Sequence, residues 1–269
     1  MTALTEIWSY RRLIGNLAQR ELRSRYKKSV LGWAWSLINP LSTLAIYTVV
    51  FGVFLKVPPP VAGNGELKSF GLYLFCALVA WNFFNGTVTG CIAALQGAGP
   101  LLKKVYFPAV CPGVAYTATV LFQTAIESLI LAVVMLIASN GSWLFLLWPL
   151  VVVMMVLFSL GLGLVLSIWN VYFRDINYLV GIGMNLLFYA TPIIYPITLV
   201  PTEKWGLPLR TIISANPLTQ YVEMSRDLFY LHVLPSLGAF AYTLAASVLT
   251  FVVGYFLFNR RALNVSEEL

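Results

Sequence analysis

Six long apolar stretches, separated by short polar segments, dominate the pattern of hydrophobic and polar positions along the chain. A membrane-spanning helix needs about 20 mainly apolar residues, and each stretch is long enough for that. The continuous stretches argue against a β-barrel, whose strands are short and alternate in polarity. We therefore expect an all-α integral membrane protein with six spans, near residues 37–55, 70–95, 109–138, 143–169, 179–200 and 237–258.

The composition supports this class of protein. Of the 269 residues, 59% are hydrophobic and 10% are charged, and the mean hydropathy is +0.83. A soluble globular domain carries about 25% charged residues. The first polar region is too long for a cleavable signal peptide. We expect a single membrane domain over residues 1–269.

The basic residues predict how the chain is oriented in the membrane. With six spans both termini lie on one side, and most of the 17 Lys and Arg residues fall in segments on that side. Cytoplasmic segments of membrane proteins carry the excess of Lys and Arg. Both termini are therefore expected in the cytoplasm.

A dense basic run leads into the first apolar stretch between residues 20 and 40. Residues 4–28 predict an amphipathic helix at the membrane interface, because apolar side chains fall on one stripe and charged ones project away. Leu13 and Leu17 fit this stripe badly. The helix is either an anchor held by anionic lipid headgroups or a docking surface for a cytoplasmic protein. The stripe comprises Leu4, Ile7, Trp8, Ile14, Ala18, Leu22 and Tyr26.

Two later segments contain residues that break helices. Residues 96–108 read QGAGPLLKKVYFP, in which the Gly and Pro residues are expected to end the second span. A short basic helix over residues 101–107, ended by Pro108, is then expected within a coupling element at 97–108; the alternative is a plain positively charged loop. In the fifth span, Pro192 and Pro196 are expected to disrupt the helix. Such breaks are tolerated where the backbone is buried or lines a water-filled cavity.

The segment 201–236 is too polar to span the membrane, yet it is rich in aromatic and aliphatic residues. We expect short amphipathic helices here before the last span, either re-entrant or lying at the outer face. They would form an external gate segment.

Few side chains suit catalysis. His232 is the single histidine, and it forms no metal-ligand spacing with the three cysteines. No P-loop motif is present, so an ATP-driven mechanism would need its nucleotide site on another polypeptide. Glu127 is the one ionisable residue deep in a predicted span. It is either a functional group or a structural one that hydrogen-bonds a neighbouring helix, near Gln123.

Several segments together resemble the permease subunit of ABC type-2 exporters, in the group that exports O-antigen, teichoic acid, capsule and related polysaccharides. They occur in the order of that family and spread over most of the chain. The segments are RELRSRYKKSVLGWAWSLINPL at 20–41, LLKKVYFP at 101–108, YFRDI at 172–176, TPIIYP at 191–196 and NPLTQYVEMSRDLFY at 216–230.

The resemblance implies a homodimeric permease of the bacterial inner membrane that moves a lipid-linked polysaccharide through a channel at the dimer interface. Two copies of a separate ATP-binding subunit would bind ATP and magnesium, so this chain would carry no cofactor. No nucleic acid partner is implied. The polymer itself is not identified by the sequence.

The resemblance also implies roles for particular residues. The first and fifth spans of the family line the channel, which selects Tyr47, Phe51 and Phe54 with Phe188, Tyr189 and Tyr195. Aromatic faces suit the C–H faces of sugars, although they suit lipid and core packing as well. The implied contacts with the ATP-binding subunit are Arg20, Glu21, Arg23, Arg25, Lys27, Leu101, Leu102, Lys103, Lys104, Tyr106 and Phe107.

Two other functions stay open at this point. One is a type-2 permease for drugs or small lipids, against which the segment at 20–41 argues. The other is a membrane-embedded transferase acting on lipid-linked sugars, which would need an acid–base pair near the membrane face. Its candidate groups, Glu127, Asp175, Glu223, Asp227 and His232, are expected in different layers of the protein.

Overall fold

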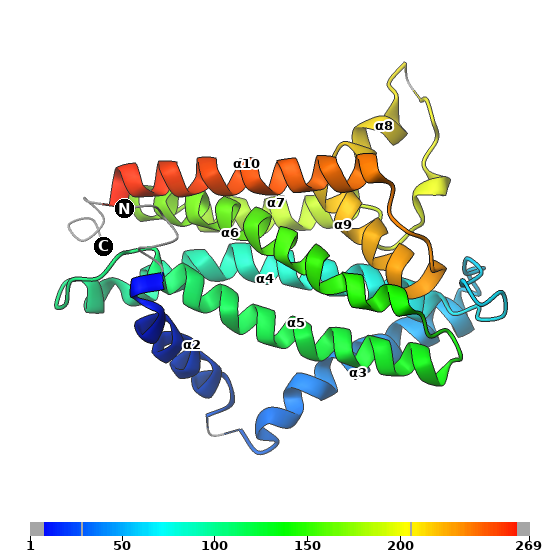
Figure 1. Cartoon of the computed structure of the whole chain (residues 1–269), viewed down its shortest axis with the longest axis horizontal. Coiled ribbons are helices and arrows are strands. Elements are labelled where there is room, and N and C mark those ends of the chain that lie inside the picture. The colour runs from blue at the N-terminus through cyan, green and yellow to red at the C-terminus, as the bar shows by residue number, and fades with distance from the viewer. Residues whose placement is uncertain (1–7, 28, 205, 263–269) are drawn as a thin grey trace.

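The computed structural model describes residues 8–27, 29–204 and 206–262, and these residues form helices joined by loops, without a β-strand. The long helices lie lengthwise beside one another, and α2 crosses one end of the bundle (Figure 1). We name this the α2 end and the opposite one the far end. The helices are α2 (Arg11–Tyr26), α3 (Trp35–Tyr47), α4 (Phe70–Leu102), α5 (Cys111–Ile137), α6 (Trp148–Tyr172), α7 (Ile176–Ala190), α8 (Leu209–Ser214), α9 (Pro217–Arg226) and α10 (Leu237–Ala262).

Five helical runs among the described residues are long and apolar enough to cross a membrane. They confirm the all-α class and five of the six expected spans. The exception is the fifth expected span, over 179–200, where the structure has only a 15-residue helix, α7. At 1.5 Å per residue α7 is about 22 Å long, which is shorter than the hydrocarbon core of about 30 Å. The five runs are Gly32–Phe54, Phe70–Leu102, Cys111–Ile137, Trp143–Tyr172 and Leu237–Ala262.

The chain leaves helical geometry where α7 meets the first of the two prolines. Thr191 precedes Pro192, and a residue before proline disfavours the helical conformation. Its backbone is extended, with φ −92° and ψ 137°. The expected disruption of this span by proline is therefore confirmed. A 3-10 turn at Ile197–Leu199 follows, and α8 then projects from the far end of the bundle (Figure 1).

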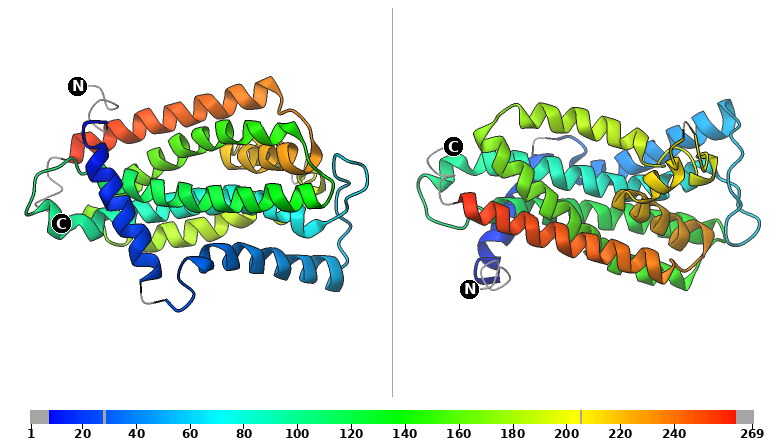
Figure 2. Two further views of the ribbon diagram at one scale, coloured as in Figure 1. Left: turned by 60° about the horizontal axis from the view of Figure 1, so that its bottom comes forward. Right: turned by 90° about the horizontal axis from the view of Figure 1, so that it is seen from above.

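The helix α2 confirms the amphipathic pattern but corrects which residues are buried. Ile14 and Leu17 are buried in a cluster with Cys111 and Ala115 of α5, whereas Trp8 is 69% exposed. Leu17 was expected to lie off the stripe, so that expectation is wrong. The apolar face of α2 packs partly on α5 and is not free to face lipid alone (Figure 2). Residues 4–7 and 28 of the expected helix lie outside the described residues.

The expected short helix over 101–107 is wrong. Instead α4 continues through Gly97, Gly99 and Pro100 to Leu102, and a turn and an irregular loop lead to α5. A proline removes one backbone donor and crowds the preceding turn. Near the end of a helix that loss affects only the last turn, and Ala98 and Gly99 are buried there, so packing maintains the helix.

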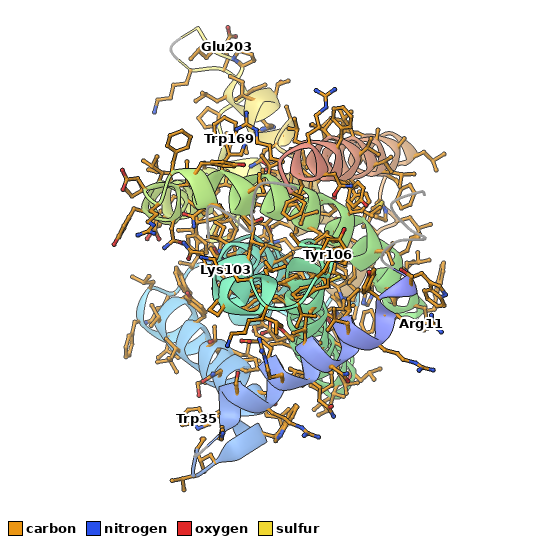
Figure 3. The ribbon with its side chains drawn as sticks, turned by 90° about the vertical axis from the view of Figure 1, so that its left-hand side faces the viewer. Arg11, Trp35, Lys103, Tyr106, Trp169 and Glu203 are labelled. Carbon is orange, nitrogen blue, oxygen red and sulfur yellow. The ribbon has the colours of Figure 1, made fainter. Side chains whose placement is uncertain are left out.

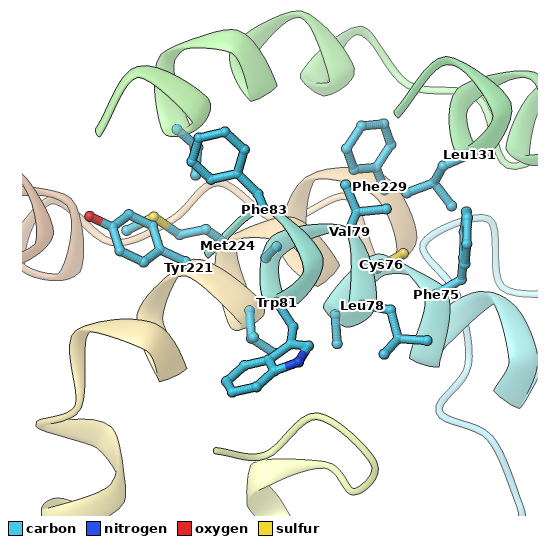
Figure 4. Packing of buried hydrophobic residues seen from close by; sticks show 14 of the residues in the cluster. Phe75, Cys76, Leu78, Val79, Trp81, Phe83, Leu131, Tyr221, Met224 and Phe229 are labelled. Atoms are coloured by element: carbon cyan, nitrogen blue, oxygen red, sulfur yellow. The ribbon is translucent and has the colours of Figure 1, made fainter. Parts of the chain in front are cut away.

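The centre of the core is the far-end third of α4. All residues from Phe70 to Trp81 are buried. Their side chains meet Leu131 of α5 and side chains of α9 and the π-helical turn that follows it (Figure 4). This part of α4 is therefore covered on every side by the rest of the chain.

Candidate functional site

The expected contact residues for an ATP-binding subunit gather at the α2 end. In Figure 3, which views this end, Lys103 and Tyr106 lie near its centre and α2 lies to one side. Tyr106 is 90% exposed, and Lys103 and Lys104 are exposed beside it. The loop therefore presents an exposed aromatic ring and two ammonium groups, which suits docking on a protein surface.

The remaining residues of this set are placed differently. Arg20, Arg23 and Lys27 are exposed on α2, and Glu21 is half-buried. Leu101 and Leu102 are half-buried at the end of α4, and Phe107 is buried, so Phe107 supports the loop from within. Nothing is described of the side chain of Arg25.

The six aromatic side chains expected in a channel divide into two groups. Phe51 stacks on Phe70 of α4 with ring centroids 5.0 Å apart, and Tyr47 lies 5.9 Å from Phe51. Phe188 meets Trp81 of α4 edge to face at 5.3 Å. These three rings are half-buried against the core. They fasten the first span and α7 to α4.

Of the other three, Phe54 and Tyr189 are exposed and Tyr195 is half-buried. Phe54 is 73% exposed and Tyr189 is 65% exposed. The Tyr195 hydroxyl donates to the Tyr189 carbonyl oxygen at 3.0 Å, which ties the two sides of the proline break together. Phe54 and Tyr189 are thus free to touch a ligand or another chain.

The helices α3 and α7 expose most of their side chains. In α7 only Met184 is buried, and the run Gly32–Phe54 is the least buried of the five candidate spans. Both pack against α4. Apart from these contacts, most side chains of α3 and α7 are left uncovered by the rest of the described chain.

A partly buried polar network joins the start of α3 to the middle of α4 and α5. Pro40 has no N–H, so the carbonyl of Ser36 lacks its helical partner. The Gln123 side chain donates to that carbonyl oxygen at 3.1 Å. Gln123 and Asn82 both donate to Glu127, at 3.4 and 3.3 Å. Glu127 was expected to hydrogen-bond near Gln123, and this is confirmed. The bonds to Gln123 and Asn82 favour a structural role for Glu127 over a functional one.

Replacing Gln123 with leucine is expected to lower the thermal stability of the purified protein. The Ser36 carbonyl would be left without a partner, which costs about 1–3 kcal/mol. In contrast, Glu127→Gln keeps one of the two accepting oxygens, so it should lose one of the two hydrogen bonds and still preserve folding and transport. A folded Glu127→Gln variant without transport would assign Glu127 a functional role.

Arg226 forms a second buried network, at the far end. Arg226 belongs to the segment 201–236, which was expected at the outer face, yet its side chain is fully buried. Its guanidinium donates to the carbonyl oxygens of Pro192 and Ile193 at 2.6 and 2.5 Å and pairs with Glu223 at 2.8 Å. It also lies 4.0 Å from the ring centre of Tyr73. Arg226 thus caps the carbonyl groups exposed by the proline break and holds them to α4.

Asp227 follows Arg226 and is half-buried. Burial, with a smaller contribution from Glu223, raises the pKa of Asp227 from its usual value near 3.8 to about 7, although Arg226 opposes the shift. A carboxyl whose pKa is raised by folding stabilises the fold fully below about pH 4 and loses that contribution as the pH rises to about 7.

Stability should therefore fall between pH 4 and pH 7, and Asp227→Asn should flatten that part of the profile. Thermal unfolding measured at each half unit of pH tests this. An unchanged slope in Asp227→Asn would show that another group titrates.

Loops at the far end are tied together by Asn140, a buried residue that sequence reasoning missed. Its side chain donates to the carbonyl oxygens of Phe229 and Tyr230 at 3.2 and 3.1 Å and accepts from the Asn64 backbone at 3.2 Å. A ring nitrogen of His232 lies 3.1 Å from the Asn140 carbonyl oxygen. His232 thus has a packing role, as expected of a lone histidine in this segment.

The described residues hold no group of three or more His, Cys, Asp or Glu side chains that could bind a metal. What they present is a membrane-spanning body with a basic, aromatic surface at one end and a tied set of loops at the other. These features define a helical membrane protein.

Comparison with known proteins agrees with this class. Residues 12–230 match the family model described as ABC-2 type transporter, and the chain belongs to that family. It is 29% identical over 265 residues to the O-antigen export system permease protein RfbA of Myxococcus xanthus, covering 98% of each chain.

Two further relatives are similar. The O-antigen export system permease protein RfbA of Klebsiella pneumoniae is 29% identical over 258 residues, covering 94% of this chain and 93% of the relative. The polysialic acid transport protein KpsM of Escherichia coli is 26% identical over 217 residues, covering 77% of each.

Proposed function

We propose that this chain is the membrane subunit of an ATP-driven exporter that moves a lipid-linked polysaccharide, similar to an O-antigen, across the inner membrane. The observation that carries the proposal is the similarity to O-antigen export permeases over almost the whole of both chains. The family match over residues 12–230 agrees with it.

In this proposal a separate subunit binds ATP and magnesium and docks on the α2 end. The exposed cations of α2, with Lys103, Lys104 and Tyr106, support this, because charge complementarity steers docking and an exposed ring supplies contact area. The α2 end is then cytoplasmic, and the first and last described residues, Trp8 and Ala262, lie there. Glu21, Arg25, Leu101, Leu102 and Phe107 belong to the same contact region.

Two copies of the chain would enclose the channel. The thin covering of α3 and α7 supports a dimer on this side. With α7 and the proline-broken segment counted as one broken span, the chain has six spans. The segment 201–236, with α8 and α9, would form the external gate. Phe54, Tyr189 and Tyr195 would then contact sugars, while Tyr47, Phe51 and Phe188 support them from behind.

The substrate class is tested by reconstituting the permease and its ATP-binding subunit in vesicles. A lipid-linked O-antigen should be exported, and a hydrophobic dye or a short-chain phospholipid should not. Export of the dye or the phospholipid alone would favour a permease for drugs or small lipids.

Charge reversal at Arg23, Arg25 and Lys27 is expected to uncouple ATP hydrolysis from export. Hydrolysis should continue while export falls at least about tenfold, since like charges across an interface cost several kcal/mol. Reversal at Lys56 and Lys68, exposed at the far end, is the matched control. If export survives the first change with the complex intact, α2 is only a lipid anchor.

A further inference from the structure

The uncovered face of α4 is unusual for a helix that spans a membrane. From residue 82 to the α2 end, one face is exposed or half-buried, whereas residues 70–81 are buried all round. Not one large apolar side chain of α4 is exposed. The uncovered residues are Asn82, Asn85, Gly86, Thr89, Ala93, Ala94, Gln96, Gly97 and Pro100, with Leu101 and Leu102 at the end.

A face that contacts lipid carries exposed apolar side chains, as α10 shows. The exposed side chains of α10 include Leu244, Val248, Leu249, Val252 and Phe256. A polar amide in hydrocarbon without a partner costs several kcal/mol. The face of α4 therefore does not face lipid.

The polar residues lie deep in the bundle. The midpoint of α4 is residue 86, so Asn85 lies about 1.5 Å from it along the axis and Asn82 about 6 Å. Asn82 also bonds Glu127 near the midpoint of α5. These amides are too deep to reach the headgroups. Within the described part of the chain, no hydrogen bond is made by the side chains of Asn85 or Gln96.

The flanks of this face are known. On one side, Trp81 of α4 contacts Phe188 of α7, and Phe84 of α4 lines a groove with residues of α6 and α7. On the other, Gly86 and Gly90 approach Val120 and Tyr116 of α5. The face thus opens on the side where α3 and α7 are thinly covered. At its α2 end, Ala93, Ala94 and Gly97 line a hollow that is shared with α2 and α5.

We infer that the face of α4 formed by Asn82, Asn85, Thr89 and Gln96 is a track for an uncharged, hydroxyl-rich glycan in the inner half of the path. Amide and hydroxyl groups exchange hydrogen bonds with sugar hydroxyls without binding any one tightly. No Lys, Arg, Asp or Glu lies between Lys68 and Lys103. Arg20 of α2 lines a hollow with Ala93 and Gly97 at the α2 end of the face. Beyond that end, α4 offers a polyanionic glycan no counter-charge. The inference rests on the proposed function and deepens it.

A cysteine at position 85 tests whether the face is in water. Native Cys76, Cys91 and Cys111 are buried, so they should give little background. In the full complex, Asn85→Cys should react with a membrane-impermeant thiosulfonate and Leu249→Cys on α10 should not. A neutral lipid-linked O-antigen should slow the reaction at least about fivefold, and lipid-linked polysialic acid should not.

An unreactive Asn85→Cys would overturn the inference, because lipid or the second copy of the chain then covers the face. Equal protection by polysialic acid would overturn the assignment to uncharged glycans. For export, Asn85→Leu should slow the O-antigen about fivefold, the effect of one lost hydrogen bond. Ala245→Leu, exposed on α10, is the matched control.

The experiments distinguish failure of the glycan track from failure of the proposed function. If the wild-type complex exports glycan and Asn85→Leu exports it equally well, the track is wrong and the proposed function stands. If the wild-type complex exports neither glycan, the proposed function fails, and the thiol reaction still shows whether the face is in water.

Discussion

Replacing Arg226 with leucine is expected to destabilise the far end of the protein by about 3–5 kcal/mol, because the carbonyl groups of Pro192 and Ile193 and the carboxylate of Glu223 lose their partner inside the protein. The midpoint of thermal unfolding should fall by roughly 10 °C or more. The fraction of monodisperse protein in detergent should fall as well.

Two controls separate charge from geometry. Arg226→Lys keeps the charge but has no planar fork to reach two carbonyl groups at once, so it should remain clearly destabilised. Arg260→Ala removes an exposed cation over Phe256 and should have little effect. Wild-type stability in Arg226→Leu would mean that the proline break is held without this network.

Replacing Gly254 with alanine is expected to force α6 and α10 apart. An added Cβ would collide with the Gly161 carbonyl oxygen and lie 2.7 Å from its carbonyl carbon. These are backbone atoms, which cannot rotate away as a side chain can. Overpacking of this kind costs about 1–3 kcal/mol or more, so thermal unfolding should shift down by roughly 5–10 °C.

Gly238→Ala on the same helix is the matched control, since nothing lies within 4 Å of its added Cβ. It should be neutral or slightly stabilising. If Gly254→Ala and Gly238→Ala unfold at the same temperature, the close crossing of α6 and α10 is wrong.

The spans and the break in the fifth were predictable because they depend on local properties. Hydropathy over about 20 residues identifies a span, and a proline acts on its own neighbours. The loop after α4 was predicted wrongly because the prediction used local properties alone. Gly97, Gly99 and Pro100 weaken a helix locally, but burial of Ala98 and Gly99 outweighs this, and burial is not visible in the local sequence.

The polar networks depend on contacts between distant helices, so most of their members were missed. Glu127 stood out as a lone acid in an apolar stretch. Its partner Asn82 and the link from Gln123 to Ser36 follow only from helix packing. Pro40 was the available signal, because it leaves the Ser36 carbonyl unpaired whatever the fold. For Arg226 no comparable signal exists, since an arginine near a membrane surface is usually exposed.

The aromatic residues show the same limit. Periodicity placed Tyr47, Phe51 and Phe54 on one face but could not distinguish Phe51, which stacks on Phe70, from exposed Phe54. The distinction affects function, since only accessible rings can touch a moving polymer. The roles of these rings and of the residues at the α2 end stay predictions.

The networks give the proposed docking at the α2 end a route to the proposed channel. The first span is joined to α5 through Gln123, and α7 is joined to α4 through Phe188 and, past its proline break, through Arg226. Few contacts hold these two spans, so a push on α2 can tilt them without unfolding the core. The covered third of α4 would stay fixed.

Export itself tests the central claim most directly. Vesicles containing this chain and its ATP-binding subunit are loaded with a lipid-linked O-antigen, and glycan reaching the opposite face is measured over time. ATP should drive its appearance, and a partner subunit that binds ATP but cannot hydrolyse it should abolish it. Export that continues at the wild-type rate with the hydrolysis-deficient partner would contradict the account.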